Sequence, residues 1–482
     1  MRNVLLLIVA FVAFANAQFF YDRHGESRGA YKDSVEYAKL VELAQRFRGP
    51  ILVKKPVEGA KPRKNLEKIP QDKIQRTFEV RRNSLRDELW LEVEKNEIVK
   101  ICVDGTVVAW ETSMNSNIFN DSCLVFTVPT LIGVESIKVY LPESDSSRKI
   151  NLAVGMKYLN FKNEEVLLGF NKYSKDWENV SELFKNEDPE RLASVTGTYL
   201  VDKYPVTNCE FTQLMWDSIP TNSSYHKSLP LKIAHEEWVT RKRSNIRNEN
   251  CAAHDTAANM VSLYQALKYA NARSVRERLR PCYIFSKTSE NAETIISKGK
   301  YVIKYWDFTI HNDEYIQVSV DYSSNGYRIP FYDEWMMLAR GGDKKNKAPW
   351  GDTSATFEEA LKYAKFNSVR PNNVKELHLS EPVGQQIPNG FGLHDMFGLV
   401  REYVLFEKKN PFSFKSSLPS CLKGGEYRIS QNHQFGKADF FPYWKKINYG
   451  YWKAGTVMNA GFRLIRNIGN NAKWTEIKSD KE

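Results

Sequence analysis

Two carboxylates in the segment GLHDMFGLVREY, residues 392–403, have a spacing that favours cation binding. Asp395 and Glu402 lie seven residues apart, and Gly398 between them allows the backbone to turn a carbonyl oxygen inward. Calcium and other hard cations take several oxygen ligands, commonly carboxylates and main-chain carbonyls of one loop. The spacing therefore predicts a cation site, and the alternative is that both carboxylates are simply solvated.

Common catalytic motifs are missing from the sequence. His235 and Glu236 begin like a zinc-protease motif, but no histidine stands at the fifth position, and no Gly-x-Ser-x-Gly nucleophile motif occurs. Gly390-Phe391-Gly392 lacks the third glycine of a dinucleotide-binding loop. These general motifs therefore indicate no catalytic centre.

A dense group of aromatic residues occupies the segment 435–452, with lysines interspersed. One interpretation is core packing in a loop-rich domain. The other is a ligand groove whose rings stack on sugars or grip a peptide. The candidate groove residues are Tyr443, Trp444, Tyr451 and Trp452.

The first folded module of the chain is predicted to be all β. Apolar and polar residues alternate over 88–161, and we expect a β-sandwich-like module over 85–165. Asp104-Gly105 is predicted to form a hairpin turn inside it. Cys102 and Cys123 lie in the same stretch, where a local disulfide and buried free thiols are the alternatives.

Beyond residue 165 the sequence predicts short strands, long loops and a few helices. One helix is expected from Val261 to Leu279, ended by Pro281. A second is expected in FYDEWMMLARGG, residues 331–342, with Pro330 at its start and Gly341-Gly342 stopping it.

The N-terminal 17 residues have the features of a cleaved signal peptide. Arg2 precedes an apolar run over 4–15, and small residues follow at 15–17. Twelve apolar residues are too few to span a bilayer, and no later segment approaches 18. We expect a secreted or periplasmic protein without a transmembrane segment, in which residues 18–84 form a helix, at 31–48, and a Pro/Lys-rich linker.

Composition and charge exclude several classes of protein. The chain has 482 residues, 42% of them hydrophobic, which indicates a globular protein of two or three domains. Its net charge of +11 comes from 69 basic and 58 acidic residues without a basic run. Because nucleic-acid binding needs a clustered basic patch, we expect none.

The order of segments after residue 165 resembles the formylglycine-generating enzyme family, also called sulfatase-modifying factors. Seven segments match in order, among them YLVDKYPVTNCEF (199–211), NGYRIPFYDEWMMLARGG (325–342), VGQQIPNGFGLHDMFGLVREY (383–403) and NAGFRLIR (459–466). The resemblance implies an α+β, C-type-lectin-like, loop-rich domain over 166–470, followed by a polar tail at 471–482. The preceding β module is not covered by the resemblance.

The resemblance also implies a metal and its ligands. In the family a calcium ion is bound in this block by a side chain, two main-chain carbonyls and a glutamate. The matching positions here are Asp395, Gly398, Val400 and Glu402. Asn367 matches the region of a second calcium, but its partner carboxylate is not placed.

The positions of the family's copper-binding cysteines hold other residues in this chain. Active members bind Cu(I) with two cysteines, and the matching residues here are Ile429 and Gln434, neither of which is a thiolate. His433 is one residue away and Cys421 lies on the other side of the double glycine. Arg401 replaces a family tryptophan and is expected to bring a charge to the groove.

Three functions follow from these features. We expect a non-catalytic protein of the cell envelope that binds a glycan or an exported peptide, or acts as a scaffold, as some bacterial relatives without the cysteine pair do in secretion machinery. The alternatives are a formylglycine-generating oxidase acting on exported sulfatases, and a different oxidase that uses His433. The first function predicts calcium and no copper.

Overall fold

The computed structural model describes residues 51–54, 69–86, 88–144, 146–169, 191–215, 255–259, 261–288, 301–307, 312–342, 349, 359, 361–365, 382–407, 420–423 and 460–477. The predicted signal peptide and the helix expected at 31–48 lie outside these residues. Within them, the helices are all too short or too polar to cross a membrane.

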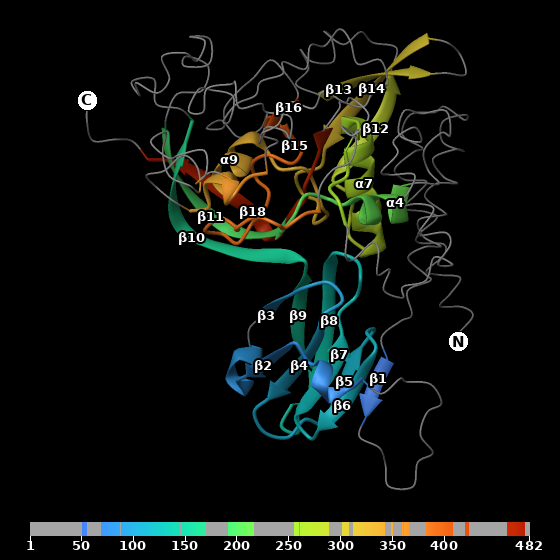
Figure 1. The fold of residues 1–482 in the computed structure, drawn as a ribbon, viewed down its shortest axis with the longest axis vertical. Coiled ribbons are helices and arrows are strands. Elements are labelled where there is room, and N and C mark those ends of the chain that lie inside the picture. The colour runs from blue at the N-terminus through green and yellow to red at the C-terminus, as the bar shows by residue number, and fades with distance from the viewer. Residues whose placement is uncertain are drawn as a thin grey trace.

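The N-terminal part is a sandwich of two β-sheets, seen at the bottom of Figure 1. One sheet has the order β1-β5-β8-β9-β3 and the other β2-β4-β7-β6. Apolar side chains from both sheets, such as Trp110, Phe126 and Leu152, form one core between them. The strands are β1 (Ile51–Lys54), β2 (Arg76–Val80), β3 (Leu89–Val93), β4 (Ile98–Val103), β5 (Ala109–Thr112), β6 (Ser116–Asn120), β7 (Cys123–Thr127), β8 (Gly133–Tyr140) and β9 (Arg148–Val154), with short 3-10 helices at Gln71–Lys73 and Arg82–Arg86.

The sandwich differs from the sequence-based expectation in two respects. Its pairing includes β1 and β2, so strands of the module begin before residue 85, inside the expected linker. The predicted hairpin at Asp104-Gly105 is wrong, because β4 and β5 belong to different sheets. The turn, with Gly105 at φ 83°, instead carries the chain from one sheet to the other.

One disulfide lies within the sandwich. Cys102 of β4 and Cys123 of β7 are direct partners across antiparallel strands and are bonded. This confirms the local bridge. Cys209 is also disulfide-bonded, whereas Cys282 is a free, buried thiol.

The described residues of the C-terminal part form three small sheets and three helices (Figure 1). The long strand β10 follows β9 directly and runs along the base of this part, antiparallel to β11. The sheets have the orders β10-β11-β18, β12-β14-β13 and β16-β15-β17. The elements are β10 (Met156–Leu168), β11 (Arg191–Asp202), α4 (Asn208–Met215), α7 (Leu263–Arg276), β12 (Tyr283–Thr288), β13 (Tyr301–Asp307), β14 (Asn312–Val320), α9 (Tyr332–Arg340), β15 (Arg401–Leu405), β16 (Ser420–Lys423), β17 (Ala460–Gly461) and β18 (Ile465–Glu476).

The two predicted helices are present with shorter bounds. Helix α7 begins at a capping box, in which Ser262 and Gln265 bond reciprocally to each other's backbone N–H, and it ends at Arg276 rather than Leu279. Helix α9 ends at Gly341 in the left-handed conformation, φ 68°. At its start Glu334 accepts a hydrogen bond from the Phe331 N–H at 2.8 Å, which is one half of a capping box. Phenylalanine has no side-chain oxygen for the other half.

Candidate functional site

Most of the predicted cation segment is buried, and its last residues, 401–403, belong to β15. Asp395 is 3% exposed and its backbone has a positive φ of 55°. Its Oδ2 accepts a hydrogen bond from the Gly384 N–H at 2.6 Å. Burial raises the pKa of Asp395 to about 6, although that hydrogen bond and Arg463 act in the opposite direction. A cation bound next to Asp395 would therefore stabilise the ionised form of its carboxyl group.

Glu402 is held by an arginine that the sequence analysis did not connect to it. Both of its oxygens accept from the Arg463 guanidinium at 2.7 to 2.9 Å, and Oε2 also accepts from Trp335 Nε1 at 2.8 Å. Both charged side chains are fully buried. Arg463 therefore already neutralises this carboxylate, as a buried charge requires.

The backbone between these carboxylates is tightly packed. Gly398 has φ 75°, and a Cβ there would lie 2.3 Å from the carbonyl oxygen of Lys365. No group of three or more His, Cys, Asp or Glu side chains suited to a metal occurs in the described part of the chain. A calcium ion would need Asp395, Glu402 and the carbonyls of Gly398 and Val400. These are hard oxygens of the kind that calcium takes, and Glu402 would share its oxygens between the ion and Arg463.

Most other predicted site residues fall outside the described residues. These are Asn367, Ile429, His433, Gln434, Tyr443, Trp444, Tyr451 and Trp452. Cys421 lies in β16, where its backbone pairs with Val404 of β15. Arg401 begins β15 and is 8% exposed.

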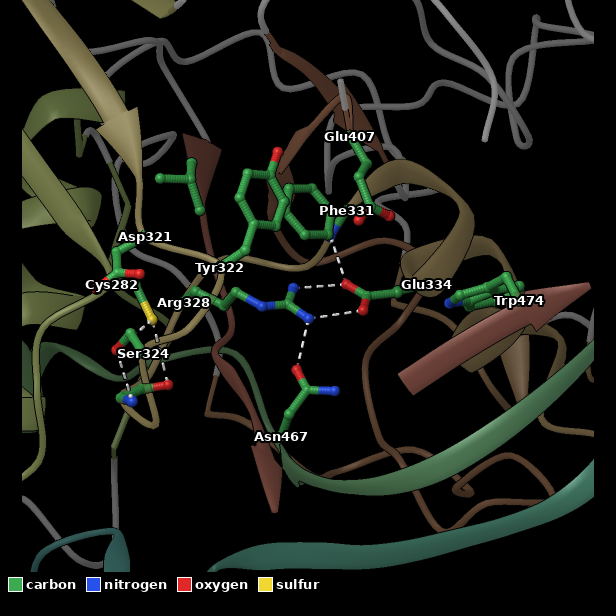
Figure 2. A pocket seen from close by; sticks show the side chains of 12 residues that line it. Cys282, Asp321, Tyr322, Ser324, Arg328, Phe331, Glu334, Glu407, Asn467 and Trp474 are labelled. Carbon is green, nitrogen blue, oxygen red and sulfur yellow. Dashed lines mark hydrogen bonds and ion pairs between the residues drawn. The ribbon is translucent and has the colours of Figure 1, made fainter. Parts of the chain in front are cut away.

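A pocket that the sequence analysis did not identify lies at the start of α9, where Phe331 and Glu334 line it (Figure 2). Its cavity is small, with a volume of about 40 Å³. Its walls come from the β14–α9 connection, the end of β15 and β18, which are distant in sequence. The lining includes Cys282, Asp321, Tyr322, Ser324, Arg328, Phe331, Glu334, Glu407, Asn467 and Trp474.

A charged pair forms the centre of this pocket. Arg328 donates to both oxygens of Glu334, at 2.6 and 2.7 Å, and to Asn467 Oδ1 at 2.7 Å (Figure 2). The carboxylate of Glu334 outweighs burial and holds the pKa of Arg328 above its ordinary value. The pair is thus ionised, and Asn467 fixes the plane of the guanidinium.

Cys282 lies at one end of the pocket but has the properties of an inert thiol. Its Sγ is 3.2 Å from Ser324 Oγ and 3.4 Å from the Gly326 carbonyl oxygen. Burial raises the pKa of this thiol, so that it stays protonated. It therefore lacks the thiolate character of a nucleophile or a copper ligand.

The sequence motifs that contain the pocket residues predicted elements of secondary structure, and they gave no sign of a binding site. Arg328 and Glu334 stand in the YRIPFYDEW block, six positions apart, where the sequence predicts a helix start. A pairing between them could have been anticipated from their opposite charges. Asn467, Trp474 and Glu407 carry no local signal, since only the fold brings them to the same place.

Comparison with known proteins relates most of the C-terminal part to one family. Residues 164–468 match the family model described as the sulfatase-modifying factor enzyme 1-like domain. A chaperone protein LppX from Paenibacillus barcinonensis is 29% identical over 179 residues, 36% of this chain and 59% of that protein. The chain thus matches about three fifths of the length of that curated relative.

Solved structures of similar proteins cover about two thirds of the chain. Treponema denticola variable protein 1 is 20% identical, with a TM-score of 0.39, over 67% of this chain and 98% of its own. PvdO from Pseudomonas aeruginosa is 13% identical, with a TM-score of 0.34, over 65% of this chain and 94% of its own.

Proposed function

The chain belongs to the family of the sulfatase-modifying factor enzyme 1-like domain, and we propose that it is a non-catalytic binding or scaffold protein of the cell envelope. One observation carries the proposal: the positions that match the family's copper ligands hold Ile429 and Gln434. An alkyl chain offers no donor and an amide offers a hard oxygen, whereas Cu(I) requires soft sulfur.

A role in export or assembly is supported by one relative. The LppX protein is named a chaperone, a function that requires binding of other proteins rather than oxidation of them. The match covers 59% of that protein. We therefore propose for this chain only the ability to bind other proteins, and not the relative's whole function. The apolar run over 4–15 supports export of the chain.

A scaffold role is further supported by how the sandwich is joined to the C-terminal part. Lys95 of the β3–β4 turn bonds Glu210 and Asp255, and Lys203 bonds Glu94 at 2.5 Å. Trp90 of β3 also stacks on Tyr158 of β10, with ring centroids 5.3 Å apart. Two parts held by such contacts would present their surfaces in a constant orientation.

The ligand in this proposal is a glycan or an exported peptide. The aromatic segment at 435–452 and Arg401 are the candidate groove residues named from the sequence. Calcium at Asp395, Gly398, Val400 and Glu402 would act as a structural ion that joins the loop to β15.

Family membership also favours the alternative, a formylglycine-generating oxidase, and one experiment separates the two. The purified full chain, with copper and oxygen, is incubated with a peptide carrying the sulfatase motif Cys-x-Pro-x-Arg. We expect no change in peptide mass. Metal analysis of the protein as purified, before copper is added, should find calcium without copper. Conversion of the cysteine to formylglycine would overturn the proposal.

A variant tests the same point in the opposite direction. Replacing Ile429 and Gln434 together by cysteine supplies two thiolates at the family's copper positions. We expect this variant to gain Cu(I) binding, measured by competition with a colorimetric chelator. Because the parent chain is measured beside it, copper bound equally by both proteins would point to ligands elsewhere.

A further inference from the structure

A lysine and two carboxylates from distant segments meet where the sandwich joins the C-terminal part. Lys95, in the turn between β3 and β4, places its Nζ 2.9 Å from Oε1 of Glu210 and 3.2 Å from Oδ2 of Asp255. We propose that Lys95 and Asp255 condense, with Glu210 as the base, into an intramolecular amide (isopeptide) bond that joins the two parts covalently. The bond would form within the folded chain and needs no ligand, so it is independent of the function proposed above.

The turn that carries the lysine is fixed by local contacts. Asn96, the next residue, has a positive φ of 62° and donates from its backbone N–H to the Pro129 carbonyl at 3.3 Å. The lysine stem passes Gly155, where a Cβ would lie 3.6 Å from Cγ of Lys95. The Lys95 side chain is 19% exposed. An amine held in this way next to a carboxyl group reacts as if its concentration were very high.

Glu210 is oriented so that one of its oxygens faces the lysine. Its Oε2 accepts from the Thr207 N–H at 3.4 Å, and the Thr207 hydroxyl accepts from the Glu210 N–H at 3.4 Å, which is a capping box at the start of α4. Oε1 is thereby directed at Nζ of Lys95. Transfer of a proton from Nζ to Oε1 removes two charges from a poorly hydrated site, so this carboxylate is suited to act as the base.

Asp255 has the surroundings of an electrophile. Its Oδ1 accepts from the Cys209 N–H at 3.3 Å, at the N-terminal end of α4. A backbone N–H at the positive end of a helix stabilises negative charge that develops on this oxygen during attack. Burial raises the pKa of Asp255 to about 6, while Lys95 opposes the rise and Glu210 adds to it. At mildly acidic pH the carboxyl group is therefore partly protonated, and a protonated carboxyl group can lose its hydroxyl as water.

Protonation of Asp255 also makes the amine easier to release. The carboxylates of Glu210 and Asp255 together hold Lys95 in its ammonium form. When Asp255 is protonated, one of these two charges is gone, and transfer of the lysine proton to Glu210 costs less. The ion pairs of the structure are thus the state that precedes the reaction.

The condensation balances without an added reagent. Glu210 takes one proton from the Lys95 ammonium, and the free amine attacks Cγ of the protonated Asp255 carboxyl group. The N–C bond forms, the bond from Cγ to Oδ2 breaks, and the hydroxyl leaves with a second nitrogen proton as water. An ammonium and a carboxylate become a neutral amide beside a neutral Glu210. Because the Glu210 and Asp255 side chains are only 4% and 11% exposed, loss of these charges favours the product.

The bond would hold the sandwich on the C-terminal part permanently. Lys95 and Asp255 are 160 positions apart, and a covalent link across so long a loop restricts the unfolded chain. The two parts would keep their relative orientation even when other contacts between them open.

Mass spectrometry of the full chain tests the proposal, because the bond removes one water molecule. The purified protein is incubated near pH 6, where the Asp255 carboxyl group is partly protonated, and is then reduced, denatured and weighed. We expect a mass one water below that calculated from the sequence between its observed ends, and a branched proteolytic peptide that joins Lys95 to Asp255. The full calculated mass, without the branched peptide, would overturn the proposal.

Two variants assign the bond to these residues. Lys95→Arg keeps a positive charge next to both carboxylates but has no amine, and Glu210→Gln keeps the side-chain shape but removes the base, so both should show their full calculated masses. Lys138→Arg, in the pair of Lys138 with Glu111 at the surface of the sandwich, is the matched control and should lose water as the parent does. Loss of water in Lys95→Arg would place the bond elsewhere and would also overturn the proposal.

Discussion

Lys95 and Glu210 form an ion pair of 2.9 Å between the sandwich and helix α4 of the C-terminal part, across 115 positions of sequence. Lys95 also reaches Asp255 at 3.2 Å. Burial lowers the pKa of Lys95, but the two carboxylates outweigh it and hold that pKa above its ordinary value. The charged lysine is therefore a structural link between the two parts.

Replacing this lysine should destabilise the whole protein. Lys95→Met leaves Glu210 and Asp255 as buried carboxylates without their cation, and breaking such a pair costs about 3 to 5 kcal/mol. Urea denaturation followed by circular dichroism measures the loss. Lys138→Met, which removes a pairing with Glu111 at the surface of the sandwich, is the control and should change stability far less. Equal losses in the two variants would contradict the role of Lys95.

The buried pair of Arg463 and Glu402 leads to a second prediction. Arg463→Met leaves the Glu402 carboxylate with only the Trp335 N–H, and we expect a loss of about 3 to 5 kcal/mol. Arg466→Met is the matched control, since Arg466 donates to the Asn325 carbonyl in an exposed position three residues along the chain. Thermal unfolding of both variants, compared with the parent, checks the difference.

Calcium binding predicts a chelator effect that depends on Asp395. A ligand bound only by the folded state stabilises it, by about 2.7 kcal/mol at a hundredfold excess over Kd. We expect EDTA to lower the melting temperature of the parent protein by several degrees and to leave Asp395→Ala unchanged. Asp72→Ala, at an exposed position, should respond as the parent does. If EDTA leaves the melting temperature of the parent protein unchanged, the protein holds no tightly bound structural calcium.

The buried carboxyl group of Glu135, in β8, should make the stability of the protein depend on pH. Burial raises the pKa of Glu135, and the nearby Glu277 adds to the rise, although Ser113 and Arg276 oppose it. At pH values between the ordinary pKa of glutamate and the raised pKa in the folded state, Glu135 is therefore protonated in the folded protein and ionised in the unfolded protein. Stability from this group is present at low pH and is lost as pH rises through the folded pKa.

Glu135→Gln should consequently be more stable than the parent at pH 7 and equal to it near pH 4. Glutamine keeps an oxygen for the Ser113 hydroxyl, which bonds Glu135 at 3.0 Å, so the comparison isolates the charge. Melting temperatures at both pH values provide the test. A variant that is less stable at pH 7 would mean that the Glu135 charge is stabilising, through Arg276.

Local patterns predicted those features that depend on neighbouring residues. Pro330, Glu334 and Gly341 mark the start and stop of α9, because caps and left-handed glycines act within one helical turn. Alternating residues predicted the strands of the sandwich. Asp104-Gly105 predicted a turn, but the choice between a hairpin and a crossing depends on which sheets the flanking strands join, and that choice is not local.

The sites show the same division. The amino-acid sequence by itself determined that Asp395 and Glu402 lie seven residues apart and that thiolates are missing at 429 and 434. Only the tertiary structure decided that Arg463 neutralises Glu402, that Lys95 reaches Glu210, and that Asn467 and Trp474 meet Arg328 in one pocket. The physical reason is that a buried charge is stable only with a partner, and long-range strand pairing and packing determine which residue arrives there.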